Sequence, residues 1–267
     1  MSNLLTRGIT GSIFVAILLS AFYFGMVTTF ILMGVVVLLG LLEFYNLFNA
    51  NQQASPCKLT GVIGGVVLYL LLNAPLIFHL SATIRFSIIL LIALPFVVEI
   101  YRNKSTPISN LAVLLFGWLY LVIPFFLVVL ISSYSIGAQL LMGLFILVWT
   151  NDTFAYLSGR FLGKHKLFER ISPNKTWEGT VGGIIFAILG GFLFAYFTNQ
   201  HYEFWIIAAF IIAVASIYGD LFQSMMKRSV GVKDSGSLLP GHGGVLDRFD
   251  AVIYAAPFFF VWLALYY

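Results

Sequence analysis

The chain has 267 residues, of which 61% are hydrophobic and only 9% are charged, and its mean hydropathy is +1.01. A soluble domain of this length needs far more polar surface, so the composition excludes one and indicates a polytopic membrane protein. The formal net charge of +4 is better explained by basic loops facing anionic lipid or an anionic substrate than by nucleic acid. The single cysteine, Cys57, excludes an intrachain disulfide.

Nine apolar stretches each approach the roughly 20 residues that a membrane-spanning helix needs. They are predicted at residues 8–24, 26–48, 61–80, 84–100, 108–131, 138–157, 179–198, 204–223 and 248–267. The first two should form a tight helical hairpin. The first is expected to be a retained span and not a signal peptide, because no small-residue cleavage site follows it. The expected fold is therefore an all-α, polytopic integral membrane bundle of about nine transmembrane helices.

Basic residues in the short loops predict the orientation of this bundle. With the N-terminus in the cytoplasm, thirteen of the fourteen Lys and Arg residues lie on the cytoplasmic side and only Arg85 lies outside. We therefore expect a cytoplasmic N-terminus.

The two halves of the chain differ in polarity. Residues 1–137 are predicted to be scaffold helices, with an oligomer interface as a further role, and residues 138–267 to be the catalytic region. Glu43 and Glu99 are polar exceptions in the first half. Each lies near a cytoplasmic span end, so its carboxylate is expected to reach the membrane interface.

Asp152 lies near the cytoplasmic end of the sixth span. Tyr156 and Arg160 follow at i+4 and i+8 and share its helix face. An internal Asp–Arg pair at a polar helix end and a functional role both remain open for Asp152.

The basic loop 159–179 ends in Ser172-Pro173-Asn174-Lys175-Thr176-Trp177-Glu178-Gly179. Ser172-Pro173 predicts a turn, and the following glycines predict a helix that begins with exposed backbone amides. A helix N-terminus beside Lys175 is a natural phosphate site, although a basic inner loop is also a topology signal.

Two further helix ends carry charged residues. The eighth span ends with Asp220, Ser224, Lys227 and Arg228, and the ninth begins with Asp247, Arg248 and Asp250. The spacings place Asp220, Ser224 and Lys227 along one face of the first helix, and Asp247 and Asp250 along one face of the second. Carboxylates facing inward from two helix ends can hold a hard cation such as Mg²⁺. A purely structural Asp–Arg network is the weaker alternative, because a charge inside the membrane costs about 2.5–3.5 kcal/mol.

A loop with little side-chain bulk, Gly241-His242-Gly243-Gly244, lies between these two helix ends. Glycines permit close backbone approach to a ligand, and successive amides can bind an anion. His242 is therefore predicted to contact the substrate. The loop lacks Walker A spacing, and the absence of HExxH and CxxC motifs makes zinc unexpected.

The segment 224–250 resembles the signature of the phosphatidate cytidylyltransferase (CDP-diacylglycerol synthase) family. The matching residues are Ser224, Met226, Lys227, Arg228, Lys233, Asp234, Gly236, Leu239, Pro240, His242, Gly243, Gly244, Val245, Asp247, Arg248, Phe249 and Asp250. The runs from Asp152 to Lys164 and from Ser172 to Gly179 are similar to a second region of the family. Residues 1–137 match only as generic spans.

This resemblance implies an Mg²⁺-dependent enzyme of the inner (plasma) membrane, often a homodimer, whose active site faces the cytoplasm. It would convert CTP and phosphatidic acid into CDP-diacylglycerol and pyrophosphate in phospholipid biosynthesis. Whether a monovalent cation joins Mg²⁺ stays open.

The interpretation assigns three sets of residues. The catalytic residues would be Lys227, Arg228, Asp247 and Asp250. The metal ligands would be Asp220, Asp247 and Asp250. The substrate-binding residues would be Lys175, Asn174, Ser224, Lys233, His242, Gly243, Gly244, Arg248, Arg160 and Asp152.

Three other classes of protein compete with this interpretation. The nearest is a CTP-dependent lipid kinase, such as a dolichol or polyprenol kinase, which would release CDP. A CDP-alcohol phosphotransferase is not expected, because its DGx2ARx8Gx3Dx3D pattern is absent. A transporter would also carry intramembrane acids, but here the acids cluster at one face of the membrane and not at its midplane.

Overall fold

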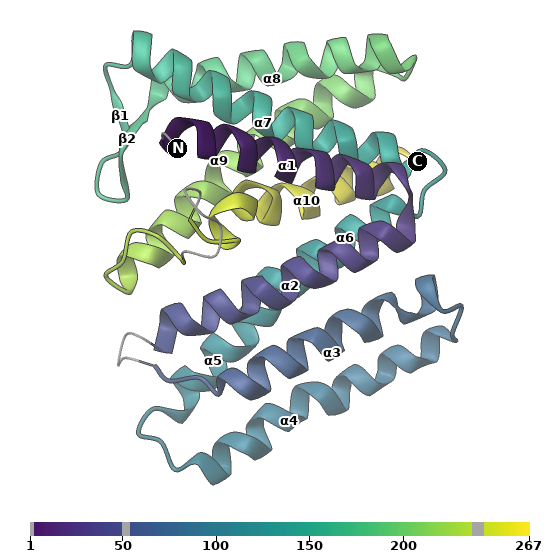
Figure 1. The fold of residues 1–267 in the computed structure, drawn as a ribbon, viewed down its shortest axis with the longest axis vertical. Coiled ribbons are helices and arrows are strands. Elements are labelled where there is room, and N and C mark those ends of the chain that lie inside the picture. Colours follow the sequence, from purple (N-terminus) through teal and green to yellow (C-terminus); the bar gives the residue numbers. More distant parts are fainter. Residues whose placement is uncertain (1–2, 50–53, 237–242) are drawn as a thin grey trace. The chain divides into compact units, whose positions relative to one another are not determined.

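The computed structural model describes residues 3–49, 54–236 and 243–267, and helices dominate these ranges (Figure 1). The α-helices are α1 (Asn3–Tyr23), α2 (Met26–Asn49), α3 (Lys58–Ile77), α4 (Ser87–Arg102), α5 (Pro107–Gly117), α6 (Ile123–Ser132), α7 (Gly137–Leu162), α8 (Trp177–Thr198), α9 (Tyr202–Ser229) and α10 (Leu246–Tyr266). The other elements are a 3₁₀ turn (Ala82–Phe86), a π-helical turn (Trp118–Val122) and the strands β1 (Lys166–Phe168) and β2 (Ser172–Thr176).

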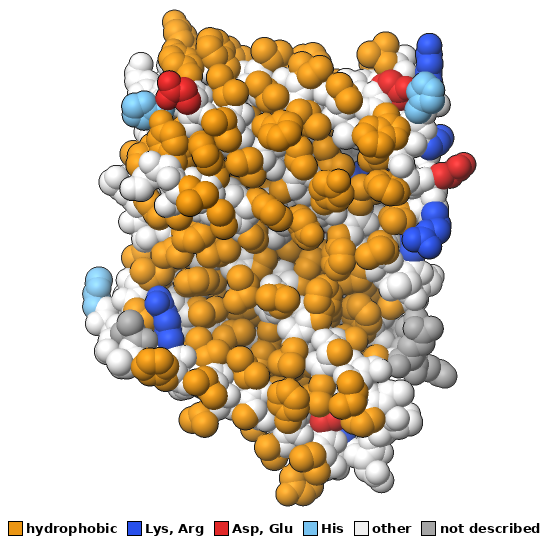
Figure 2. Space-filling view, turned by 180° about the vertical axis from the view of Figure 1, so that it is seen from behind, with side chains coloured by type: hydrophobic (Ala, Val, Ile, Leu, Met, Phe, Trp, Pro, Cys, Tyr) orange, Lys and Arg blue, Asp and Glu red, His pale blue; other side chains and the backbone are white. Residues whose placement is uncertain are grey.

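Within the described ranges, 8 helical stretches are long and apolar enough to cross a membrane. They are Met26–Asn49, Lys58–Ile77, Thr83–Arg102, Pro107–Ser132, Gly137–Leu162, Trp177–Thr198, Tyr202–Ser229 and Leu246–Tyr266. A shorter apolar helix, Gly8–Tyr23, precedes them, so each of the nine predicted spans corresponds to an apolar helix. Figure 2 shows one face of the molecule, on which hydrophobic side chains cover most of the visible surface. The polytopic, all-α fold class is confirmed.

The fifth predicted span contains a local irregularity. Its helix runs from Pro107 to Ser132 but passes through a π-helical turn that ends directly before Ile123 and Pro124. Proline lacks a backbone N–H, and its ring crowds the carbonyl group four residues earlier. A wider turn accommodates both effects without ending the helix.

Contacts within the chain divide it into two compact units. Unit 1 consists of Met1–Gly137 and Ser229–Arg248, and unit 2 consists of Ala138–Arg228 and Phe249–Tyr267. The segment that contains the glycine-rich loop therefore folds with the N-terminal helices.

In unit 1, α2, α3 and α4 lie side by side (Figure 1), and aromatic side chains with satisfied polar ends hold the helices together. The Tyr45 hydroxyl donates to the carbonyl oxygen of Leu114 at 2.7 Å, and the Trp118 indole donates to that of Gly61 at 2.7 Å. Each ring buries a large apolar area while its polar atom keeps a partner.

Glu43 and Glu99 do not reach the membrane interface, so that expectation is wrong. Their exposed fractions are only 3% and 5%. Glu99 accepts hydrogen bonds from Arg102 and Asn110, both at 2.6 Å, and Arg102 also donates to the Ser55 carbonyl at 2.7 Å. The burial of Glu99 is tolerated because Arg102 and Asn110 replace the water that its carboxylate loses.

In unit 2, glycines allow helices to approach one another closely. A Cβ atom on Gly182 of α8 would lie 2.2 Å from the Ser158 hydroxyl oxygen of α7. A Cβ atom on Gly219 of α9 would lie 2.6 Å from the Asp250 carbonyl oxygen of α10. Small residues at such crossings let helix backbones pack tightly in a membrane protein.

Candidate functional site

Three carboxylates in unit 2 lie within electrostatic reach of one another. The close approach at Gly219 places Asp220 of α9 next to the start of α10, and the charges of Asp220 and Asp152 both act on Asp250. Asp152 lies on α7 and interacts with Asp220 directly. Asp152 and Asp220 lie inside α7 (Gly137–Leu162) and α9 (Tyr202–Ser229), more than two turns before each helix ends.

Two lysines complete this group. The Lys175 ammonium lies 2.5 Å from the Asp220 carboxylate, and the two side chains are 26% and 38% exposed. Lys175 also interacts electrostatically with Asp152, and Lys227 of α9 with Asp250. We call Asp152, Lys175, Asp220, Lys227 and Asp250 the charge cluster. It brings together five of the predicted site residues from α7, β2, α9 and α10.

The charge cluster has the donor chemistry of a site for a hard cation. Among the described residues, no three Asp, Glu, His or Cys side chains form a group that could hold a metal ion by themselves. Mg²⁺ usually takes one or two carboxylates and completes its shell with substrate phosphates and water. Asp220 and Asp250 fit that role. Asp247 belongs to unit 1, and its grouping with them stays a prediction.

The loop after α7 differs from its prediction, because it contains a β-hairpin that joins α7 to α8 (Figure 1). The turn lies at residues 169–171, and Ser172 and Pro173 begin β2. The predicted turn at Ser172-Pro173 is therefore wrong by a few residues. Proline is tolerated there because it stands near the start of a strand.

The first turn of α8 does not present open amides as expected. Thr176 caps the helix by accepting a hydrogen bond from the Gly179 amide at 3.1 Å, and the Trp177 amide donates to the His165 carbonyl at 3.0 Å. The expectation of exposed amides is wrong for Trp177 and Gly179. Lys175 instead directs its ammonium group to Asp220.

The Glu178 side chain, in the first turn of α8, forms hydrogen bonds with the segment that follows α7. Its carboxylate accepts hydrogen bonds from the amides of Lys164 at 3.0 Å and His165 at 3.2 Å, and it lies 2.6 Å from the His165 ring nitrogen Nδ1. These contacts fix the hairpin that carries Lys175.

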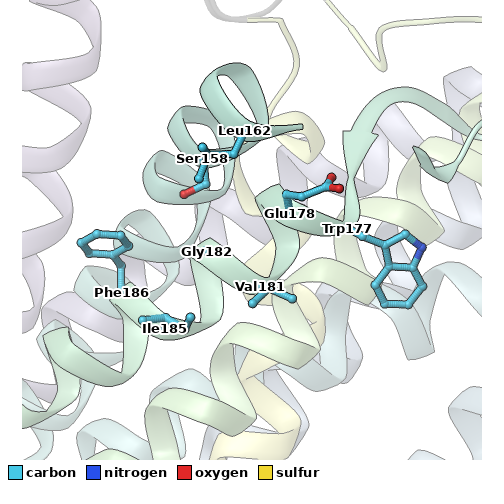
Figure 3. A pocket seen from close by; sticks show the side chains of 8 residues that line it. All are labelled: Ser158, Leu162, Trp177, Glu178, Val181, Gly182, Ile185 and Phe186. Carbon is cyan, nitrogen blue, oxygen red and sulfur yellow. The ribbon is translucent and has the colours of Figure 1, made fainter. Parts of the chain in front are cut away.

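An apolar groove of about 490 Å³ lies between α7 and α8 (Figure 3). Ser158 and Leu162 line it from α7, and the α8 residues that line it are Trp177, Glu178, Val181, Gly182, Ile185 and Phe186. Its single charged side chain is already bonded to the loop after α7. The charge cluster is therefore the better candidate for binding a polyanionic substrate.

The last residue of the glycine-rich loop of unit 1, Gly244, donates its backbone amide to a carboxylate of the same chain. Asp247 Oδ2 accepts hydrogen bonds from the amides of Ser235 at 3.1 Å and Gly244 at 3.2 Å. Gly243 adopts a φ of 80°, which favours glycine. The predicted contact His242 lies outside the described residues. The amides of Gly244, Val245 and Leu246 donate to two carboxylates of the chain itself, those of Asp247 and Glu43, and anion binding from a substrate by this loop stays a prediction.

The remaining predicted residues lie largely at the surface. Arg160 donates to the Tyr156 hydroxyl at 3.4 Å, and Asp152 accepts from the Asn151 side chain at 3.3 Å. Ser224 is half-buried on α9, one turn beyond Asp220, and the exposed residues are Asn174, Arg228, Lys233 and Arg248. Sequence reasoning missed the contact of Glu43 with the loop.

These features define an integral membrane protein with a bundle of apolar helices and a cluster of acids and lysines contributed by α7, β2, α9 and α10. The model of the cytidylyltransferase family matches residues 5–266, and the chain belongs to this family.

Several relatives carry the name phosphatidate cytidylyltransferase. The one from Haemophilus influenzae is 48% identical over 129 residues, which are 46% of this chain and 45% of the relative. That from Staphylococcus epidermidis is 45% identical over 125 residues, 46% of this chain and 48% of the relative. That from Rickettsia bellii is 41% identical over 168 residues, 59% of this chain and 72% of the relative. The chain thus spans about half the length of the first two relatives.

Proposed function

We propose that this protein is a nucleotidyltransferase that converts CTP and phosphatidic acid into CDP-diacylglycerol and pyrophosphate. The observation that carries the proposal is the charge cluster, in which three carboxylates and two lysines from four elements meet. Family membership supports cytidylyl transfer. The printed names of the relatives support phosphatidate as the acceptor.

The proposed reaction requires positioning and charge neutralisation more than proton transfer. A phosphomonoester has a second pKa near 6, so the phosphatidate phosphate is already an anionic nucleophile at neutral pH. One of its oxygens attacks the α-phosphorus of CTP, a new P–O bond forms, and the bond to the β-phosphate oxygen breaks as pyrophosphate leaves. No strong general base is needed, and binding the two substrates in line supplies much of the acceleration.

The lysines and acids of the charge cluster divide this work. Lys175 and Lys227 would bind phosphate oxygens; Asp220 forms an ion pair with Lys175, and the charge of Asp250 attracts Lys227. Asp220 and Asp250, with Asp247 as the proposed third ligand, would also hold Mg²⁺. A bound Mg²⁺ would neutralise phosphate charge and complete its shell with phosphate oxygens and water.

The Lys175–Asp220 ion pair bears on how a nucleotide would bind to the charge cluster. A triphosphate offers Lys175 more negative charge than one carboxylate does, so the incoming nucleotide would compete with Asp220 for this lysine. The exchange would free Asp220 at the moment when phosphate oxygens arrive.

We further propose an inner-membrane protein with a cytoplasmic N-terminus and a cytoplasmic site, since CTP is cytosolic and the basic loops favour that side. A homodimer is part of the same proposal. Light scattering of the purified protein in detergent tests the dimer, and a monomer mass would contradict it.

The decisive assay incubates the purified protein with CTP, phosphatidic acid and Mg²⁺ and identifies the products. We expect equal amounts of pyrophosphate and CDP-diacylglycerol. Release of CDP together with a phosphorylated lipid would instead identify a CTP-dependent lipid kinase.

A further inference from the structure

A buried carboxylate from the N-terminal helices contacts the start of α10. Glu43 lies on α2, about two hundred residues before that helix, and its exposed fraction is 3%. Its two oxygens accept hydrogen bonds from the backbone amides of Val245 at 2.8 Å and Leu246 at 3.0 Å. These contacts lie within unit 1, and they place a negative charge directly on the first amides of α10.

The same carboxylate packs against backbone on both sides of residues 237–242. A Cβ atom on Gly236 would lie 2.9 Å from one Glu43 oxygen, and a Cβ atom on Gly244 would lie 2.5 Å from the other. Only glycine leaves room for the carboxylate at these two positions. Glu43 therefore occupies the point where the two ends of the glycine-rich loop meet.

Asp247 holds the same backbone from the other direction. Its Oδ2 accepts from the amides of Ser235 and Gly244, while Glu43 accepts from the next two amides. The peptide that leads into Asp247 is thus fixed at consecutive amides by two carboxylates. The position of Asp247 depends on this peptide, since Asp247 is the second residue of α10.

The physical chemistry of these contacts favours a negatively charged acceptor over a neutral one. Backbone amides at a helix N-terminus have no partner within the helix, and the helix dipole favours a negative charge there. Hydrogen bonds that involve an ionised group are shorter and stronger than neutral ones. A neutral side chain of the same size would leave at least one buried amide without its acceptor.

We propose that Glu43 is a positioning residue of the active site, which fixes the first amides of α10 and, through them, the Asp247 carboxylate. This inference rests on the proposed function only in that Asp247 is taken to act in the transfer reaction. It assigns a role in the reaction to a residue of the predicted scaffold half.

The test compares Glu43→Gln with Glu99→Gln in the full-length protein. Glu99 is a matched control, because it is equally buried in unit 1 but bonds to Arg102 and Asn110. Amide hydrogen exchange of the peptide 243–249 reports on the loop without reference to activity. Steady-state kinetics with CTP and phosphatidic acid, at several Mg²⁺ concentrations, report on Asp247.

We expect Glu43→Gln to accelerate exchange at Val245 and Leu246 at least ten-fold and to lower kcat at least ten-fold. The KM for phosphatidate should stay within about two-fold, and half-saturation by Mg²⁺ should move to higher concentration. Glu99→Gln should leave exchange of this peptide unchanged and kcat within about two-fold.

Equal losses of kcat in both variants, or unchanged exchange in Glu43→Gln, would overturn the proposal. If Glu43→Gln does not fold, Glu43→Asp replaces it. That variant keeps the charge but retracts it by one methylene group, and it should show a smaller acceleration of exchange than Glu43→Gln is expected to show. Exchange as slow as in the wild type would again overturn the proposal. An inactive wild-type protein would refute the proposed function, while the exchange contrast would still decide whether Glu43 fixes the loop.

Discussion

The Lys175–Asp220 ion pair makes a quantitative prediction for a double-mutant cycle. Two unit charges about 4 Å apart attract by roughly 4 kcal/mol at an effective dielectric constant of about 20. The side chains are 26% and 38% exposed, so solvent screening and lost side-chain entropy reduce this value. Exposed pairs contribute about 0.2–1 kcal/mol when measured, and we expect a coupling energy near the upper end, about 1 kcal/mol.

The assay compares thermal unfolding of four purified proteins: the wild type, Lys175→Ala, Asp220→Asn and the double variant. A coupling of about 1 kcal/mol corresponds to a shift of about 2–4 °C in Tm for a domain of this size class. Lys166→Ala provides the control, because Lys166 lies exposed on β1 of the same hairpin. Its cycle with Asp220→Asn should be additive within about 0.5 kcal/mol. Additive effects of Lys175→Ala and Asp220→Asn would refute the ion pair.

Three further predictions concern the site and the topology. Asp247→Asn should lower turnover at least about 100-fold while the protein stays folded, because a metal ligand is lost; near-normal activity at saturating Mg²⁺ would remove Asp247 from the metal site. On a Cys57→Ser background, a cysteine at Asn199 should react with an impermeant reagent in intact cells and one at Lys233 should not; labelling at Lys233 would reverse the predicted orientation. Lys175→Ala should raise the KM for CTP more than that for phosphatidate, and the opposite pattern in steady-state kinetics would assign the hairpin to the lipid phosphate.

Helical features were predictable because their signals lie in the local sequence. Long apolar stretches identified the spans, and i, i+3 and i+4 spacings placed Asp220 and Lys227 on one face of α9. The convergence of Asp220 with Asp250 followed from two helix ends that each carry acids. Asp152, which the sequence assigns to substrate binding, belongs to the same group of carboxylates.

Other features depend on contacts that no local pattern encodes. The partners of Glu43 are backbone amides, which leave no signature in the sequence of side chains. The hairpin strands have 3 and 5 residues, and the polar, Pro-containing second strand has little β-propensity. Gly182 makes room for Ser158 of the neighbouring helix, and this close packing depends on a residue 24 positions earlier in the chain.

The most direct test of the account follows the two ends of the triphosphate separately. The purified protein is incubated with phosphatidic acid, Mg²⁺ and CTP labelled with ³²P at either the α- or the γ-phosphorus. Cytidylyl transfer predicts that the α-label enters the lipid fraction and that the γ-label leaves as pyrophosphate. Label from the γ-position in the lipid, with the α-label remaining in soluble CDP, would contradict the proposed reaction.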